Sequence, residues 1–182
     1  MEKTRNKMTL LSVLLLGLVL VSIAWPVASA AQDDQDDPPT RVARLAYMEG
    51  SVSFQPAGED DWVGAVTNRP LTTGDKLWVE QGSRAELQLG SAVIRISGDT
   101  GISFLNLDDH TVQIQLSSGT IDLRVRRLDG DDDFEIDTPN LAFTALRPGR
   151  YRLIANDDGS TTTIGIRWGG EGEATGNGQA YT

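Results

Sequence analysis

Three groups of side chains in this sequence are of types that could do chemistry, and the densest group is acidic. Asp129, Asp131 and Asp133 alternate in the segment DGDDD, as the first carboxylate ligands of a calcium-binding loop do. The glycine and the later glutamate that complete such a loop are missing from their places. These aspartates are the candidate metal ligands of the chain, but the pattern favours a solvated acidic turn without a metal ion.

No catalytic centre is indicated. The chain has one histidine, His110, and no cysteine, so a zinc site would need carboxylates to complete it and disulfides are excluded. A general base also needs a nucleophile within reach, and none is signalled near His110. We expect a protein that is not an enzyme, with no catalytic residue and no cofactor.

Arginines form the second group. Arg124 and Arg126 are two residues apart, as are Arg150 and Arg152, and alternate residues of a strand share a face. Such a basic stripe could bind an anion or an acidic partner. The alternative, which we favour at this point, is pairing with acids on neighbouring strands, such as Asp122. The four arginines are interaction candidates.

Tryptophans form the third group. Trp62, Trp78 and Trp168 could line a platform for a carbohydrate or a peptide, although large aromatics in a β domain more often pack in the core or at its rim. Trp62 follows a polar loop and precedes Gly64, so it is the best candidate for an exposed contact. Trp78 is a second interaction candidate.

The elements that must position these side chains are short β-strands. In residues 84–89 apolar and polar side chains alternate, which is typical of a half-buried strand. Glycine- or aspartate-containing breaks recur along the chain at intervals of about ten residues, the spacing of all-β folds. No segment after residue 31 has a convincing helical period. The further strands are expected at residues 42–48, 51–55, 76–79, 93–96, 102–107, 111–116, 120–125, 134–137, 141–146, 151–155 and 161–168.

This pattern predicts a single all-β domain, either a β-sandwich or a β-solenoid-like coil of short strands. Each strand has one polar face, which suits antiparallel sheets packed face to face and equally suits rungs stacked along an axis. The glycine-rich residues 169–173 and 176–178 are expected to form turns. Residues 178–182 resemble the start of another strand, so we expect either a short terminal strand or truncation of a longer protein at its C-terminus.

The N-terminal segment indicates export. Lys3, Arg5 and Lys7 precede an apolar run, and residues 28–30 form an A-x-A cleavage pattern, so residues 1–30 are predicted to be a signal peptide. Residues 31–40 form an acidic flexible linker, and residues 41–182 form the β domain. We expect secretion across the inner membrane to the periplasm or the extracellular space, with no stable membrane span after cleavage. The alternative is a chain anchored by an uncleaved signal.

The net charge of the chain bears on which classes of molecule it can bind. The net charge of −10 at pH 7 disfavours nucleic acid and anionic lipid.

Several motifs resemble those of one known family, the periplasmic domain of the FecR family. The resemblance covers residues 42–153 and rests on turn glycines and strand patterns in combination. The motifs are Trp62, RPLTTGDKL (69–77), SRAELQLGS (83–91), LSSGTI (116–121), FEIDTPN (134–140) and LRPGRYRL (146–153).

The resemblance implies an extracytoplasmic, solenoid-like β domain that transmits or receives signals through protein contacts. Regulators of this family also carry a cytoplasmic segment that binds a sigma factor. Only about seven residues precede the apolar run here, so we expect no direct sigma-factor contact. We expect an envelope protein as partner, held by aromatic residues and by strand addition at an exposed sheet edge. The alternative is a β domain that binds a small ligand or a glycan.

Overall fold

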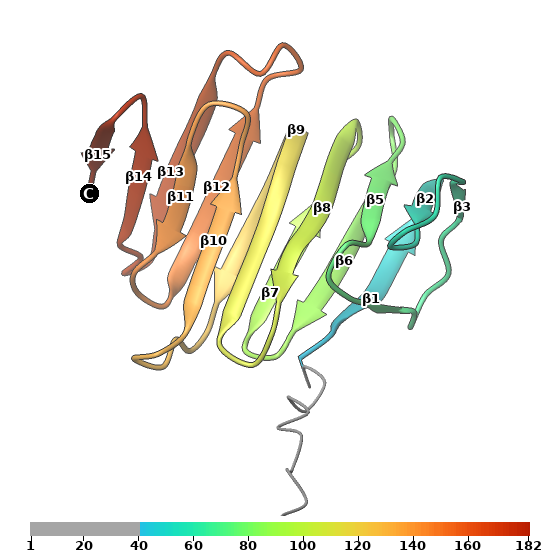
Figure 1. Ribbon diagram of the computed structural model, residues 1–182, viewed down its shortest axis with the longest axis horizontal. Helices are drawn as coiled ribbons and strands as arrows, with labels where there is room; N and C mark the ends of the chain where they lie inside the picture. Colours follow the sequence, from blue (N-terminus) through green and yellow to red (C-terminus); the bar gives the residue numbers. More distant parts are fainter. Residues whose placement is uncertain (1–40) are drawn as a thin grey trace, which may run out of the picture. The chain divides into compact units, whose positions relative to one another are not determined.

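The computed structural model describes residues 41–182, and this part of the chain consists of fifteen β-strands with no helix (Figure 1). The all-β fold predicted from the alternating pattern is therefore confirmed. The predicted signal peptide and acidic linker lie outside the described residues. Between residues 41 and 182 no helix is long and apolar enough to cross a membrane.

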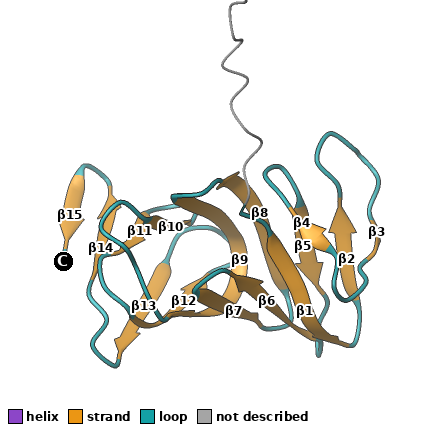
Figure 2. Cartoon of the chain, turned by 90° about the horizontal axis from the view of Figure 1, so that it is seen from below, coloured by secondary structure: helices purple, strands orange, loops and turns teal. Residues whose placement is uncertain are grey.

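Two sheets face each other and share one strand, β9 (Thr111–Val125) (Figure 2). Sheet A contains, in spatial order, β4 (Pro70–Leu71), β1 (Ala43–Glu49), β6 (Arg84–Leu89), β7 (Ala92–Ile96), the second half of β9, β12 (Gly149–Ala155) and β13 (Thr162–Arg167). Sheet B contains β3 (Val63–Gly64), β2 (Val52–Gln55), β5 (Lys76–Val79), β8 (Thr100–Leu107), the first half of β9, β10 (Asp133–Asp137), β11 (Ala142–Ala145), β14 (Gly172–Gly176) and β15 (Gln179–Tyr181).

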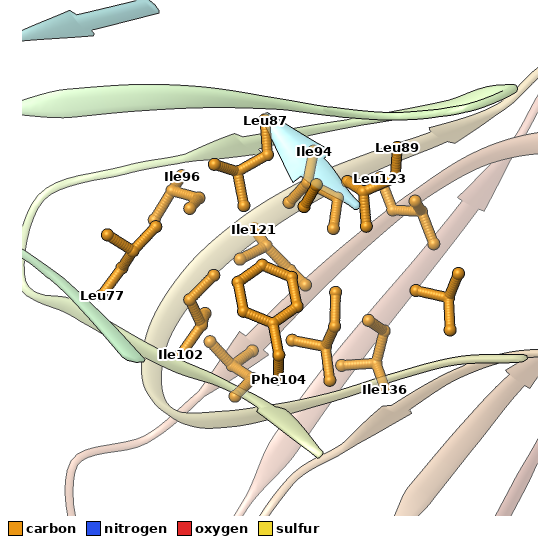
Figure 3. Close-up of a cluster of buried hydrophobic side chains, with 14 of the residues drawn as sticks. Leu77, Leu87, Leu89, Ile94, Ile96, Ile102, Phe104, Ile121, Leu123 and Ile136 are labelled. Carbon is orange, nitrogen blue, oxygen red and sulfur yellow. The ribbon is translucent and has the colours of Figure 1, made fainter. Parts of the chain in front are cut away.

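The core lies between the two sheets (Figure 3). Leu87, Ile94 and Leu123 point inward from sheet A, and Ile102 and Phe104 point inward from sheet B, all of them buried. Because successive side chains of a strand point to opposite faces, burial of the apolar set turns the charged set outward. The alternation in the sequence therefore places every second side chain of each inner strand on an outer face.

Both predicted architectures are present in part. The two facing sheets and their shared core are those of a sandwich. The chain, however, crosses repeatedly from one sheet to the other while it advances along both, as a solenoid does. Within the described residues the strand pairs are antiparallel except β9 with β10, so the chain makes hairpins where a regular solenoid would stack parallel rungs.

The prediction of two separate strands broken at Gly119 is wrong. Ser118 still pairs with Gly101 of sheet B, and Gly119 already pairs with Ala155 of sheet A. Gly119 has a φ of +94°, and a Cβ at this position would lie 2.3 Å from Thr100 Oγ1 and 2.5 Å from Asp99 O. The glycine thus bends one continuous strand from one sheet into the other.

The glycine-rich tail was also predicted incorrectly in part. Residues 172–176 form β14 and not a turn, and β15 is the terminal strand that the sequence predicted. Gly172 lies on the inner face of β14 against the ring of Phe143, where a Cβ would come within 2.4 Å of Cζ. Glycine is needed there for close packing of a strand against an aromatic ring.

The LTTGD turn before β5 is organised by a buried carboxylate. Asp75 accepts hydrogen bonds from the backbone N–H groups of Ala57 (2.9 Å) and Thr72 (2.8 Å). The N–H of Gly74 donates to Phe104 O at 2.7 Å, and the N–H of Phe104 donates to Asp75 O at 2.9 Å. The turn therefore ties three segments of the N-terminal half together and is structural.

We expect Gly119→Ala to lower the free energy of unfolding by at least about 3 kcal/mol, because the methyl group meets backbone and the φ is unfavourable. Urea unfolding followed by tryptophan fluorescence measures the loss. Gly130→Ala is the matched control, since a Cβ there has no neighbour within 4 Å, and it should change stability by less than about 0.5 kcal/mol. Equal effects of the two substitutions would contradict the role given to Gly119.

Candidate interaction surface

Three arginines stand side by side on the outer face of sheet A. Arg124 of β9 is directly opposite Arg150 of β12, and Arg150 is directly opposite Arg167 of β13. Neighbouring strands are about 4.8 Å apart, so three positive charges cross three strands in one line, which we call the arginine row. Within residues 41–182 none of the three makes an ion pair.

The next line of side chains lies two residues along the strands, and there each arginine is paired with an acidic side chain. Arg95 Nε lies 2.8 Å from Glu86 Oε2, and Arg152 Nη1 lies 2.7 Å from Asp122 Oδ2. Pairing with acids of neighbouring strands, the favoured interpretation of the basic stripe, therefore holds for Arg152. The same interpretation is wrong for Arg124 and Arg150, since like charges lie directly opposite each other there, an arrangement that disfavours folding.

Trp168 stands at the end of the arginine row. Its side chain is 76% exposed, and its φ of +58° is uncommon for a residue other than glycine. The guanidinium carbon of Arg150 lies 5.7 Å from the centre of the Trp168 ring. A depression of about 430 Å³ on this face is lined by Asp122, Arg150, Arg152, Gly165, Arg167 and Trp168.

Arg167 was not among the predicted interaction residues, and Trp168 was considered only as part of an aromatic platform. Arg167 and Trp168 are adjacent in the sequence, but only the register of β13 on β12 brings Arg167 next to Arg150. The alternation of polar residues indicated that Arg167 faces solvent and could not indicate which side chain lies beside it. Arg126, which was predicted, lies just past β9 in a second depression of about 550 Å³ together with Arg127 and Ser91.

The other two tryptophans of the predicted platform, Trp62 and Trp78, do not join this surface. Trp62 is 47% exposed, as expected, but it precedes β3 at the far end of sheet B. Trp78 is half-buried on the outer face of sheet B, opposite Gly101 and packed where a Cβ of that glycine would be. Trp62, Trp78 and Trp168 therefore belong to separate regions and form no common platform.

The candidate metal ligands are not brought together either. Asp129 Oδ2 lies 3.4 Å from Arg127 Nε, and Asp131 Oδ2 lies 3.2 Å from Nδ1 of the exposed His110. Asp133 begins β10. In the part of the chain that the structure describes, no group of three potential ligands is placed to hold one metal ion.

The outer face of sheet B carries acidic side chains, whereas the outer face of sheet A carries the arginine row. Glu135 and Asp137 lie along β10, and the side-chain amide of Gln113 donates to both carboxylates, at 2.8 Å and 2.9 Å. Burial, and then the charge of Asp137, raise the pKa of Glu135; burial and the charge of Glu135 raise the pKa of Asp133. The two outer faces thus carry opposite charge.

Substitution of an arginine by threonine should change the free energy of unfolding less in the arginine row than in the neutralised line next to it. Arg150→Thr removes a like-charge contact and should change the free energy of unfolding by no more than about 0.5 kcal/mol. Arg152→Thr leaves Asp122 without its partner and should be less stable than Arg150→Thr by about 0.5–1 kcal/mol. Urea unfolding at low ionic strength tests this, and a larger loss for Arg150→Thr would show that the row is structural.

The pH dependence of stability tests the acidic face. Because the pKa of Glu135 in the folded chain lies above its unfolded value, the carboxyl is costly to ionise, and this cost disappears as the pH falls through the folded pKa. Glu135→Gln should therefore raise the free energy of unfolding at pH 7, by less than about 1 kcal/mol for a solvent-screened group. The gain should vanish near pH 4. Glu59→Gln, in an exposed loop, is the control, and a gain that does not depend on pH would contradict this account.

Comparison with known proteins agrees with the sequence motifs. Searches of curated proteins and of solved structures each found no match to the chain. A protein-family model described as FecR protein matches residues 75–168, which run from the buried Asp75 to the exposed Trp168 and make up just over half of the 182 residues. The match includes β9, β12 and β13, which carry the arginine row. The chain therefore belongs to the FecR protein family.

Proposed function

We propose that this chain is a non-enzymatic interaction module of the cell envelope that binds an acidic partner protein on the arginine row. Membership of the FecR family supports a sensor or protein-interaction role. The signal peptide expected at residues 1–30 supports a location in the periplasm or outside the cell. A partner protein in the cell envelope agrees with both the family role and this location.

The observation that carries the proposal is the absence of neutralisation in the arginine row. The protein has a net charge of −10, and yet Arg124, Arg150 and Arg167 lie side by side and make no ion pair with an acid of the described residues. Three adjacent cations disfavour the fold, so their placement is better explained by a binding partner than by stability.

The residue types of the surface support a protein as the partner. Arginine and tryptophan are enriched at the centres of protein interfaces, where an exposed aromatic ring and a planar guanidinium make large, specific contacts. The arginine row also lies across the open outer face of a sheet, a shape that suits a protein surface. Electrostatic complementarity at such a face raises the association rate as well as the specificity.

A second candidate is a glycan that carries carboxylates. Trp168 and the adjoining depression of about 430 Å³ favour it, because a sugar ring can stack on the indole while its carboxylate pairs with Arg150. Titration with uronic-acid oligosaccharides, followed by the intrinsic fluorescence of the protein, distinguishes this candidate from a protein partner.

Quantitative capture from the envelope fraction of the native host tests the proposal. We expect proteins retained by the wild-type chain to be retained at least about tenfold less by Arg150→Glu, equivalent to about 1.4 kcal/mol. Arg44→Glu is the matched control, since it makes the same charge change on the same face at the other end of sheet A. The binding of each retained protein is then measured with purified components.

Two outcomes would contradict the proposal. One is equal loss of binding by Arg150→Glu and Arg44→Glu, which would reflect net charge and not the arginine row. The other is no specific retention by the wild-type chain.

A further inference from the structure

We propose that the partner contributes a β-strand that pairs with the free edge of β13 and continues sheet A. The added strand is inferred to carry acidic side chains at alternate positions, facing outward, with apolar side chains between them, facing inward. This inference rests on the proposed function and specifies how the partner binds and which sequence pattern it must have.

The edge of β13 differs from the other three sheet edges. Sheet A ends at β4 and β13, and sheet B ends at β3 and β15. Among these strands β4 and β3 have 2 residues and β15 has 3, whereas β13 has 6. Short edge strands are a common protection against unwanted strand pairing. Within residues 41–182 β13 pairs with β12 alone, so its second edge is long and unprotected.

The outer face at this edge selects for acidic side chains. The arginine row runs across β9 and β12 and ends on β13 at Arg167. A residue directly opposite Arg167 on an added strand would have its Cβ about 5 Å away, the distance at which opposite charges stabilise a strand pair. The side chain of the added strand at this position would extend the row with negative charge.

The inner face at this edge selects for apolar side chains. Beyond the shared β9, sheet A has two strands, β12 and β13, whereas sheet B has four, so β15 extends past β13 (Figures 1 and 2). Ile166 is opposite the buried Tyr151 and therefore faces inward, yet it is 42% exposed. Tyr181 is opposite the half-buried Ala174 of β14, which packs on the core, and is 64% exposed. An added strand would cover Ile166 and face Tyr181.

The charges also argue against a second copy of the chain at this edge. Antiparallel pairing of two β13 strands over their full length would place Arg167 of each copy opposite Thr162 of the other. A second copy would therefore bring no carboxylate to the end of either arginine row. An acidic strand from a different protein would place an opposite charge beside Arg167.

The probe for this inference is a synthetic peptide of four Val-Glu repeats, capped at both ends, with four Val-Lys repeats as its charge-reversed counterpart. Amide hydrogen exchange is followed by NMR on the full chain at pH 7 and low ionic strength. We expect the Val-Glu peptide to slow exchange of amides in β13 at least tenfold at saturation, and to leave those of β4 and β15 unchanged. The Val-Lys peptide should give no protection.

Substitution of the last arginine in the row should reverse the preference. Arg167→Glu is expected to bind the Val-Glu peptide at least tenfold more weakly and to gain protection of β13 from the Val-Lys peptide. Arg44→Glu, with the same charge change far from β13, should behave as the wild-type chain does. Equal urea midpoints of the two variants exclude unfolding as the cause.

Three results would overturn the inference. They are protection of β13 by both peptides alike, protection by neither, and a dimer of the free chain that already protects β13. The proposed function can stand even if this inference fails, because separate experiments test the two. If Arg150→Glu loses the captured partner while β13 stays unprotected by either peptide, the arginine row binds without strand addition, and the interaction module stands.

Discussion

The fold depends on one bend, the passage of β9 from sheet B to sheet A at Gly119. Backbone hydrogen bonds hold a strand to its neighbours in one plane, so a strand that serves two facing sheets must turn sharply without losing its pairing. A side chain at this position would meet the backbone of residues 99 and 100 at 2.5–2.6 Å, and the φ of +94° is one that glycine adopts freely. The shared strand then sets the register of β7, β8, β10 and β12 at once.

The functional surface follows from that register. Because β7 and β12 both pair with the second half of β9, the side chains of sheet A line up in rows across the strands. One row combines Glu86, Arg95, Asp122 and Arg152 and is neutral, and the adjacent row concentrates three arginines. A shift of β12 by two residues would place Arg150 beside Asp122 and separate it from Arg124, so the line of three arginines would not form. Packing of the core thus selects the register, and the register determines which charged side chains are neighbours on the outer face.

The alternating pattern was sufficient to predict most strands, since β1, β2, β5, β6, β8, β10 and β12 lie close to where it placed them. It failed at Gly119 and at residues 172–176, and both failures have the same origin. Glycine was interpreted as a break in the chain, but at these positions the absence of a side chain is required by a close contact within a strand. The contact is with residues distant in sequence, Thr100 in one case and Phe143 in the other, and no local pattern indicates it.

The sequence by itself determined the strand content, the inward and outward faces, the acidic character of the chain and the family motifs, because each of these depends on residue type and local period. Which outward side chains become neighbours was decided only by the tertiary structure. Cross-strand pairing brings Arg124, Arg150 and Arg167 together from three strands and separates Trp62, Trp78 and Trp168. Pairing is selected by how the buried residues pack between two sheets, an energy shared over the whole core and absent from any single segment.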